Sequence, residues 1–425
     1  MTQEKKHSGT GQDCPKGYKS CDGYRIPKEW HIVRFDSLFS RVTRKNDENN
    51  QNVLTISAQQ GLISQIEYYN TLYASENKTG YTLLHRGDFS YNKSYSSGYA
   101  YGAIKRLDAY EKGIVSPLYL CFTPRQGVNS DFYLQYFEAG CFDREIYKIA
   151  QEGARNHGLL NVSTEDFFHS MLVFPPLEEQ ERITEILTQC DHVIELKEQK
   201  LDELKQLKKE FLRKMFPAKG CDTPEIRFPG FTGAWEQRKL GELGTITTGS
   251  TPSTSIPDYY SDDGIVWVTP TDICENITFE SARKLSDLGQ QVGRVVPKNT
   301  ILVTCIASIG KNTMLGNTGS FNQQINGLTP NENECDPYFL LTESALWSAK
   351  MKSSAAAGTM QIVNRTEFSE LKTWLPSLIE QQAISDFFRQ LDNLITLHQR
   401  ELEETKTYKK TLAKLLLTGI VRVQG

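Results

Sequence analysis

The sequence predicts an α+β fold in which two similar globular segments, built of mixed strands and short helices, are each followed by one long helix. The first observation is an internal duplication, because the stretches that begin at Pro175 and Pro376 align without a gap at an offset of 201 residues. The second is heptad spacing of apolar residues after these prolines, and no proline or glycine interrupts either run before Pro217 or Gly419. The third is the period-two alternation, broken by turn residues, in the segments that precede the two stretches.

The duplication sets the order of the domains. A gapless repeat of this length does not arise by chance, and its unit is far longer than a solenoid repeat. Matching pairs are Leu177/Leu378, Glu179/Glu380, Gln180/Gln381, Ile183/Ile384, Asp191/Asp392, Leu196/Leu397 and Leu201/Leu402. We expect a flexible tail, a globular domain, a long helix, a linker, a second globular domain, a second long helix and a short tail. Their expected bounds are 1–23, 24–172, 173–216, 217–223, 224–373, 374–417 and 418–425.

The two globular segments share a frame but differ in most residues. Each is entered through a tryptophan, Trp30 in the first and Trp235 in the second. Strand-like stretches at 113–124 and 319–330 align without a gap, and 265–268 and 300–304 also have strand character. We further expect short helices at 131–137 and 336–341 and glycine-bearing loops at 153–158 and 357–361.

The two long helices have regular ends and an apolar seam. Prolines precede them, acidic residues occupy the first turn, and lysine and arginine occupy the last turn of the first helix, as the helix dipole favours. A helix over 177–215 would extend about 58 Å at 1.5 Å per residue, which is longer than one small domain needs. We therefore expect the two helices to pack on each other, and the alternative is that each lies on its own domain. The expected seam residues are Ile194, Leu201, Leu204, Phe211, Ile395, Leu402 and Leu412.

Composition excludes several classes of protein. The 425-residue chain is 38% hydrophobic and carries a net charge of −4, so overall charge gives no support for nucleic-acid binding. Its nine cysteines are scattered without a C-x-x-C pair, which favours reduced thiols over a disulfide framework or a zinc site. No apolar run has the length of a membrane span and the N-terminus does not resemble a signal peptide. We therefore expect a cytoplasmic protein that makes no contact with membranes.

No catalytic constellation is found. Gly310-Lys311 is followed by Asn312 and lacks the first glycine of a phosphate-binding loop, and neither G-x-S-x-G nor H-E-x-x-H occurs. The motifs of an amino-methyltransferase are missing too, and the seven histidines show no ligand spacing. The chain is thus expected to be non-catalytic, with no metal site and no cofactor of its own.

Several loops instead carry residues suited to nucleic acid. Residues 81–112 contain six tyrosines interleaved with lysine and arginine in a glycine-punctuated stretch, a composition that can contact phosphates and base edges. The alternative is an edge hairpin whose tyrosines pack on their neighbours. The amides at 322–324 can pair with adenine, although strand alternation turns half of them inward. Candidate DNA contacts are Tyr91, Lys93, Tyr95, Tyr99, Lys105, Arg106, Arg155, Asn156, His157, Lys311, Asn312, Gln323, Gln324, Lys350 and Lys352.

The two helices that open P-x-L-x-E-Q-x-x-I, each closing a variable segment entered through a tryptophan, resemble the specificity subunit of Type I restriction–modification systems. The phrases at 249–253 (Gly-Ser-Thr-Pro-Ser) and 267–272 (Trp-Val-Thr-Pro-Thr-Asp) are similar to that family's target recognition domains. The resemblance covers nearly the whole chain from Tyr24. It implies two target recognition domains that each read half of a split double-stranded DNA site. It also implies an antiparallel coiled coil, hence a pseudo-twofold relation of the two halves, which sets the spacing and docks two modification subunits. Methyl transfer from S-adenosylmethionine is then expected on those partners, and cleavage on separate restriction subunits.

Two other classes stay open on the sequence alone. One is a DNA methyltransferase or nuclease with an undetected active site, against which the missing cofactor and metal motifs argue. The other is a coiled-coil scaffold that binds only proteins, against which the Tyr/Lys/Arg loops argue. The recognised bases, the spacer length and the methylated position are not encoded in any pattern of the sequence.

Overall fold

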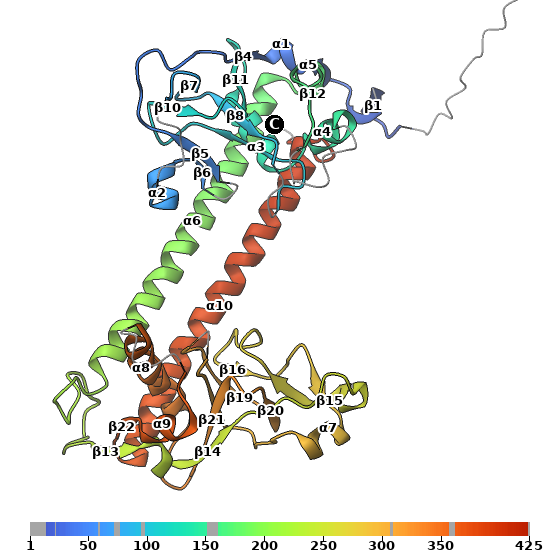
Figure 1. The fold of residues 1–425 in the computed structure, drawn as a ribbon. Helices are drawn as coiled ribbons and strands as arrows, with labels where there is room; N and C mark the ends of the chain where they lie inside the picture. The colour runs from blue at the N-terminus through green and yellow to red at the C-terminus, as the bar shows by residue number, and fades with distance from the viewer. Residues whose placement is uncertain are drawn as a thin grey trace, which may run out of the picture. The chain divides into compact units, whose positions relative to one another are not determined.

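The computed structural model describes residues 14–21, 23–57, 60–71, 77–94, 98–150, 160–306, 309–356 and 362–423. The chain forms two compact units: the first comprises Met1–Lys197 and Glu401–Gly425, and the second comprises Glu198–Arg400 (Figure 1). Each unit therefore contains one globular segment, part of one long helix and the opposite part of the other.

The first unit is built around a four-stranded antiparallel sheet with the strand order β4-β11-β8-β9. The unit also contains the two-stranded pairs β1-β2, β3-β12, β5-β6 and β7-β10. The elements are β1 (Tyr18–Cys21), β2 (Tyr24–Pro27), β3 (His31–Arg34), α1 (Phe35–Leu38), β4 (Phe39–Arg41), β5 (Leu54–Ser57), β6 (Gly61–Ser64), α2 (Gln65–Tyr69), β7 (Thr82–His85), β8 (Phe89–Asn92), β9 (Ala103–Arg106), β10 (Lys112–Val115), β11 (Leu120–Pro124), α3 (Ser130–Glu138), α4 (Asp143–Ile149), α5 (Thr164–His169), β12 (Met171–Phe174) and the long helix α6 (Leu177–Lys214).

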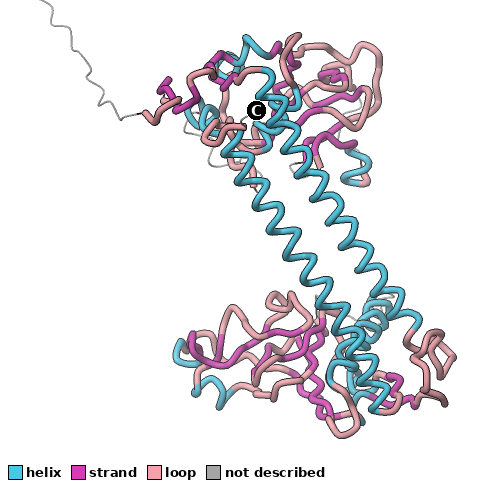
Figure 2. Tube along the Cα trace, turned by 180° about the vertical axis from the view of Figure 1, so that it is seen from behind, coloured by secondary structure: helices cyan, strands magenta, loops and turns pink. Residues whose placement is uncertain are grey.

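The second unit repeats this sheet in the order β14-β21-β18-β19 and adds β16 at its edge. A second sheet, β17-β15-β20, and the pair β13-β22 complete it (Figure 2, strands in magenta). The elements are β13 (Glu236–Lys239), η2 (Leu240–Glu242), β14 (Gly244–Thr248), η3 (Pro257–Tyr259), β15 (Tyr260–Val268), β16 (Ile277–Thr278), β17 (Lys284–Leu285), α7 (Asp287–Val292), β18 (Ile301–Thr304), β19 (Asn312–Leu315), β20 (Gly319–Phe321), β21 (Ile325–Pro330), α8 (Pro337–Ala356), α9 (Arg365–Glu370), β22 (Lys372–Leu375) and the long helix α10 (Leu378–Leu417).

The shared frame expected from the sequence is confirmed by this topology. Strands β4, β8, β9 and β11 of the first unit have the same order and directions as β14, β18, β19 and β21 of the second. In both units a short helix and a strand (α5 and β12, α9 and β22) lead directly into the long helix.

The end of each long helix belongs to a hydrophobic core. In the first unit Leu416 and Leu417 of α10 pack in the core that contains Trp30 and Ile183 of α6. In the second unit the segment at the end of α6, with Met215 and Phe216, packs in the core that contains Trp235 and Ile384 of α10. Each core is thus completed by the end of the long helix that belongs to the other repeat. The two repeats are therefore joined within both units.

The long helices run antiparallel within each unit. In the first unit Lys409 forms an ion pair with Asp191, and Lys197 Nζ lies 2.9 Å from Glu401 Oε2. In the second unit Lys208 Nζ lies 2.5 Å from Asp392 Oδ1, and the rings of Phe211 and Phe387 meet edge to face at 4.8 Å. Residue numbers rise along one helix while they fall along the other, which defines the direction.

Burial along α6 and α10 matches the expected seam. Leu201 and Leu402 are each only 5% exposed and Leu204 is also buried, whereas Ile194, Phe211, Ile395 and Leu412 are half-buried. Positions between them are open, and Leu196 and Leu397 are about half exposed. The helices therefore pack on each other within each unit, so the alternative in which each helix lies only on its own domain is wrong.

Some expected segments differ from the structure. The tail expected over 1–23 contains β1, which pairs with β2. Lys19 Nζ also donates to Lys28 O at 2.8 Å, and the Tyr18 hydroxyl donates to Ile420 O at 3.0 Å. The short C-terminal tail contacts the first unit, where Arg422 Nε donates to Glu179 Oε1 at 2.6 Å. The short helix expected at 336–341 is the 20-residue α8, since apolar residues such as Trp347 extend its buried face.

Candidate nucleic-acid interface

The two sheets present equivalent edges. In the first unit β4 and β8 end where β11 begins, and in the second β14 and β18 end where β21 begins, because neighbouring strands are antiparallel. We call the residues there the loop edge of each unit. In the first unit the described loop edge comprises 42–45, 93–94, 98–102, 116–119 and 160–164. In the second unit it comprises 249–256, 305–306, 309–311, 322–324 and 362–364.

A later segment joins this edge in the same way in both units. Leu160 N–H donates to Lys93 O at 2.9 Å in the first unit. In the second, Val363 N–H donates to Cys305 O at 3.1 Å, and Asn326 Nδ2 donates to Val363 O at 3.0 Å. The glycine-bearing loops expected at 153–158 and 357–361 lie outside the described residues, but the segments that continue from them meet the loop edge.

The two motifs singled out in the second repeat build its loop edge. Ser250 N–H donates to Phe321 O at 2.9 Å and Trp267 Nε1 donates to Ser250 O at 3.0 Å, so 249–253, 267–272 and 322–324 are joined. A Cβ at Gly249 would lie 2.1 Å from Asn322 O, so no larger residue fits that close approach. These contacts leave Thr251 and Gln323 exposed, and the Thr251 hydroxyl donates to Gln323 Oε1.

Of the candidate residues in the second unit, three lie at the loop edge. Lys311 is exposed and its Nζ donates to Pro270 O at 3.1 Å; Gln323 is exposed and Gln324 is half-buried. Asn312 instead accepts a hydrogen bond from Ser348 of α8 at 2.7 Å. The remaining two, Lys350 and Lys352, are exposed on α8. Lys350 Nζ donates to Lys372 O at 3.3 Å, and the Lys352 stem packs beside Gly310.

In the first unit the structure places Tyr91 differently from its expected role. Tyr91 has no exposed surface: its ring stacks on Phe167 with centroids 5.2 Å apart, and its hydroxyl donates to Tyr101 O. Alternation along β8 turns this side chain into the core, so the packing alternative holds for it. Lys93 lies at the loop edge as expected, with its Nζ donating to Val162 O at 2.7 Å.

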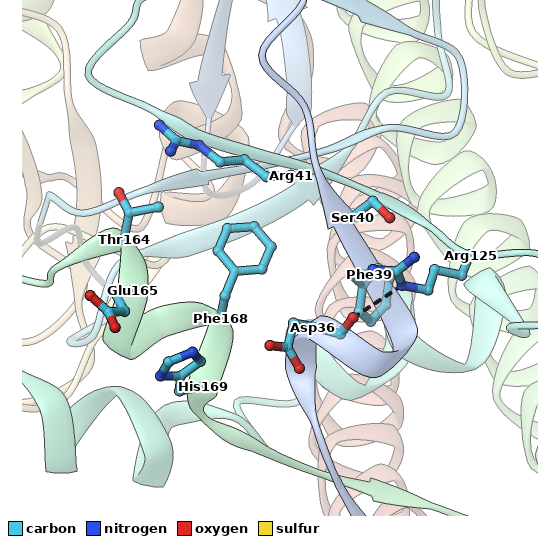
Figure 3. A pocket seen from close by; sticks show the side chains of 9 residues that line it. All are labelled: Asp36, Phe39, Ser40, Arg41, Arg125, Thr164, Glu165, Phe168 and His169. Carbon is cyan, nitrogen blue, oxygen red and sulfur yellow. Dashed lines mark hydrogen bonds between the residues drawn. The ribbon is translucent and has the colours of Figure 1, made fainter.

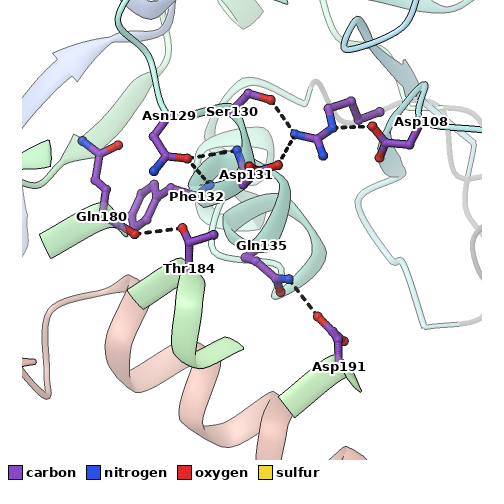
Figure 4. Close-up of polar contacts among 10 residues, drawn as sticks. Asp108, Asn129, Ser130, Asp131, Phe132, Gln135, Gln180, Thr184 and Asp191 are labelled. Atoms are coloured by element: carbon purple, nitrogen blue, oxygen red, sulfur yellow. Dashed lines mark hydrogen bonds and ion pairs between the residues drawn. The ribbon is translucent and has the colours of Figure 1, made fainter. Parts of the chain in front are cut away.

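Two basic candidates are engaged by carboxylates of the same unit. Lys105 is only 5% exposed and its ammonium lies 2.6 Å from Glu138 Oε1, while the Tyr99 hydroxyl donates to the same carboxylate. Arg106 donates to Asp108 and to Asp131 at the start of α3, at 2.7 and 2.6 Å (Figure 4). These ion pairs connect β9 to α3 and leave the side chains of Lys105 and Arg106 largely buried. No local pattern in the sequence indicated this. Tyr95, Arg155, Asn156 and His157 lie outside the described residues.

Basic residues that the sequence reasoning missed line two adjoining hollows in the first unit. One, of about 470 Å³, is lined by Arg41, Arg125, Asp36 and Glu165 among others, with Arg125 Nε donating to Asp36 O at 3.0 Å (Figure 3). The other, of about 140 Å³, shares Arg41 and Thr164 with the first. The only signal that could have found Arg41 is its place at the end of a strand that leads into the loop edge.

Among the described residues, no group of three or more His, Cys, Asp or Glu side chains is placed to hold a metal ion. Burial raises the pKa of the Cys121 and Cys305 thiols to about 11, which keeps them protonated and poorly nucleophilic at neutral pH. None of the helices in the described part of the chain has the length and apolar character needed to cross a bilayer.

Residues 27–206 and 233–407, one match per repeat, correspond to the family described as Type I restriction modification DNA specificity domain. The chain belongs to this family. Both matches run from the globular segment into the long helix, so the family's domain includes the helix as well as the sheet.

The chain is similar to specificity subunits of type I restriction enzymes. The type I restriction enzyme MjaVIII specificity subunit of Methanocaldococcus jannaschii is 23% identical over 436 residues, covering 96% of this chain and 97% of that protein. The putative MjaX specificity subunit of the same organism is 23% identical over 315 residues, covering 72% and 71%. The HindI specificity subunit of Haemophilus influenzae is 29% identical over 171 residues, covering 38% and 37%.

Solved structures agree on the fold. A chain from a structure concerned with complex assembly and conformational transition of the type I R-M system is 16% identical, with a TM-score of 0.61, covering 94% of this chain and 100% of that one. The type I restriction-modification S subunit from M. genitalium is 14% identical, with a TM-score of 0.52, covering 91% and 96%. At these identities the likeness establishes the fold alone.

Proposed function

We propose that this chain is the DNA-sequence recognition subunit of a Type I restriction–modification complex. The observation that carries the proposal is the family match in both repeats, each ending in a long helix. The equivalent loop edges give it a physical basis: two surfaces of the same construction bear different side chains, as two readers of different half-sites require.

We assign one half of an asymmetric, bipartite DNA site to each loop edge. The aligned stretches 113–124 and 319–330 place Leu118 of the first unit at the position of Gln324 of the second. Leu118 is 75% exposed, and an apolar side chain of this kind can contact a thymine methyl group. Amides such as those of Gln323 and Gln324 can pair with adenine. The two uninterrupted helices set the spacing of the half-sites.

The partners in this proposal are double-stranded DNA and two modification subunits, with restriction subunits in the full complex. Two equivalent docking positions are supported by exposed apolar residues that recur at the offset of 201 residues: Val193/Leu394, Leu196/Leu397 and Leu207/Tyr408. Each of these side chains is between 44% and 65% exposed, so all of them are available for burial in a contact with a partner subunit. Methyl transfer from S-adenosylmethionine is assigned to the modification subunits and none to this chain.

The proposal is tested by sequencing the methylated bases in a host that expresses this chain together with its modification subunit. The expected result is methylation within one interrupted, asymmetric motif. The control is the same host with the modification subunit alone, in which the motif is expected to stay unmethylated. A continuous motif, or methylation that persists without this chain, would contradict the proposal.

A further inference from the structure

The smaller hollow at the loop edge of the first unit combines three cations from different segments. It has a volume of about 140 Å³ and is lined by Arg41, Lys45 and Lys93, which lie at the end of β4, four residues after it and just beyond β8. Hydroxyl groups complete the polar lining, and no aspartate or glutamate among the described residues lines it. The hydroxyl residues are Thr43, Thr82, Tyr119 and Thr164.

The three cations keep donors free for a ligand. Among the described residues, the exposed Arg41 guanidinium makes no hydrogen bond and no ion pair. Lys45 Nζ donates to Gly80 O at 3.1 Å and Lys93 Nζ donates to Val162 O at 2.7 Å, so each ammonium uses one of its three donors on a carbonyl. Both lysines are thereby held in place without being neutralised.

Among the described residues, no carboxylate forms an ion pair with any of the three cations. Asp36 and Glu165 line the adjoining larger hollow, which shares Arg41 and Thr164 (Figure 3). The neighbouring Arg44 is paired with Asp88 and so belongs to a separate contact. Gathering like charges without a counter-charge destabilises the folded chain, and an anionic ligand removes that cost. Partial burial lowers the pKa of Lys93.

We propose that this hollow binds one phosphate group of the DNA backbone. This inference rests on the proposed function and identifies a site where the first unit contacts DNA. The volume lies below the roughly 300–1,000 Å³ of pockets that hold a whole small molecule, so the hollow suits a small anionic group. Arginine and lysine with hydroxyl groups are the usual partners of phosphate oxygens. Leu118, which lines the same hollow, is exposed next to the phosphate position.

The test measures how binding of a labelled mixed-sequence duplex depends on salt, with the full chain assembled with its modification subunit. Each neutralised phosphate contributes about −0.9 to the slope of log Kobs against log salt. Arg41→Ala is expected to lower the slope by about one unit and to weaken binding about eightfold near 0.1 M salt, equally for all sequences. Arg41→Lys, which keeps the charge, is expected to retain the slope.

The matched control is Arg86→Ala. Arg86 also belongs to the first unit, is 52% exposed and pairs with the exposed Glu111, but it precedes β8 whereas Lys93 follows it. Its loss removes the same charge from the opposite end of that strand, and the slope is expected to stay unchanged. An unchanged slope in Arg41→Ala, or an equal loss in both alanine variants, overturns the phosphate site while the proposed function stands. Failure of the wild-type complex to bind any DNA overturns both.

Discussion

Glu138 and Glu343 occupy equivalent positions of the duplicated frame, five residues after Tyr133 and Tyr338, but their environments differ. Glu138 is partly exposed and balances Lys105. Glu343 is only 3% exposed and accepts a hydrogen bond from Trp374 N–H at 3.0 Å, while its Oε2 has no partner among the described residues. Burial therefore raises the pKa of Glu343 from 4.5 to about 7.

Replacing this carboxyl with a neutral amide tests how much its ionisation destabilises the folded protein. Because the folded pKa lies above the unfolded value, the folded state binds more protons between 4.5 and about 7, and stability falls as pH rises through that window. Glu343→Gln is expected to remove this loss and to stabilise the second unit by ~3 kcal/mol above the window, at about 1.4 kcal/mol per pKa unit. Chemical denaturation at pH values below and above the window measures it.

The exposed Glu334 of the same unit provides the control for that measurement. Its side chain is 52% exposed, so Glu334→Gln is expected to leave the pH dependence as in the wild type. If Glu343→Gln and the wild type lose stability in parallel as pH rises, Glu343 is not the group that titrates in this window.

At the scale of elements, the two long helices are joined by a pair of equivalent ion pairs. Asp191 and Asp392, at an offset of 201 residues, each bind the lysine of the other helix, Lys409 and Lys208. Each aspartate also accepts a hydrogen bond from the helix that follows the central sheet strand: Gln135 Nε2 of α3 at 2.9 Å (Figure 4) and the Tyr338 hydroxyl of α8 at 2.9 Å. The aspartates thus connect seam and globular domain within each unit.

A double-mutant cycle on Lys208 and Asp392 tests that connection. The side chains are 25% and 11% exposed, so their hydrogen-bonded ion pair is expected to show a coupling energy of at least ~1 kcal/mol. Lys200 and Glu203 on the same helix, 54% and 72% exposed, form the control cycle, expected near zero. Urea denaturation of the single and double alanine variants gives both energies. Equal coupling energies in the two cycles would show that the Lys208–Asp392 pair stabilises the fold no more than an exposed ion pair does.

The exposed apolar positions of the helices give a prediction about docking. Leu196 and Leu397 are 50% and 52% exposed, so changing both to glutamate is expected to leave folding intact. Copurification of the modification subunit is expected to fall sharply, because a charge would be buried in the contact. Thr396→Glu, at an exposed polar position of α10, is the control expected to retain the partner. Full retention of the partner by the double leucine variant would place the docking surface elsewhere.

At the scale of the whole molecule, the duplication predicts that residues 1–217 form a symmetric dimer. The first helix then takes the place of the second: Lys208 of one copy meets Asp191 of the other, as Lys409 does in this chain. One contact between the helices would change from attractive to repulsive, however. Lys200 stands at the position of Glu401, so Lys197 would face a lysine of the other copy instead of a carboxylate.

The fragment is therefore expected to dimerise weakly, because two Lys197–Lys200 repulsions oppose the two Lys208–Asp191 attractions. Leu204 and Phe211 would also replace Thr405 and Leu412, and this overpacking can cost roughly 1–3 kcal/mol. Lys200→Glu restores the charge pattern of the intact chain and is expected to strengthen the dimer. Sedimentation equilibrium of the fragment and of its Lys200→Glu variant measures the two association constants. A fragment that stays monomeric even as Lys200→Glu would end this prediction.

The sequence by itself determined the duplication, the two long helices and their seam, because burial along a single element repeats with that element's own period. It also placed Lys93 in a loop that the fold brings to one sheet edge, whereas Gln323, expected within a strand, lies in the loop between β20 and β21. Only the tertiary structure decided that Tyr91 faces the core and that Lys105 and Arg106 are held by carboxylates from α3 and its neighbourhood. It alone gathered Arg41, Lys45 and Lys93 around one hollow. The physical reason is that the partner of a charged side chain often comes from a segment far away in the chain. No local periodicity of the sequence predicts such a contact.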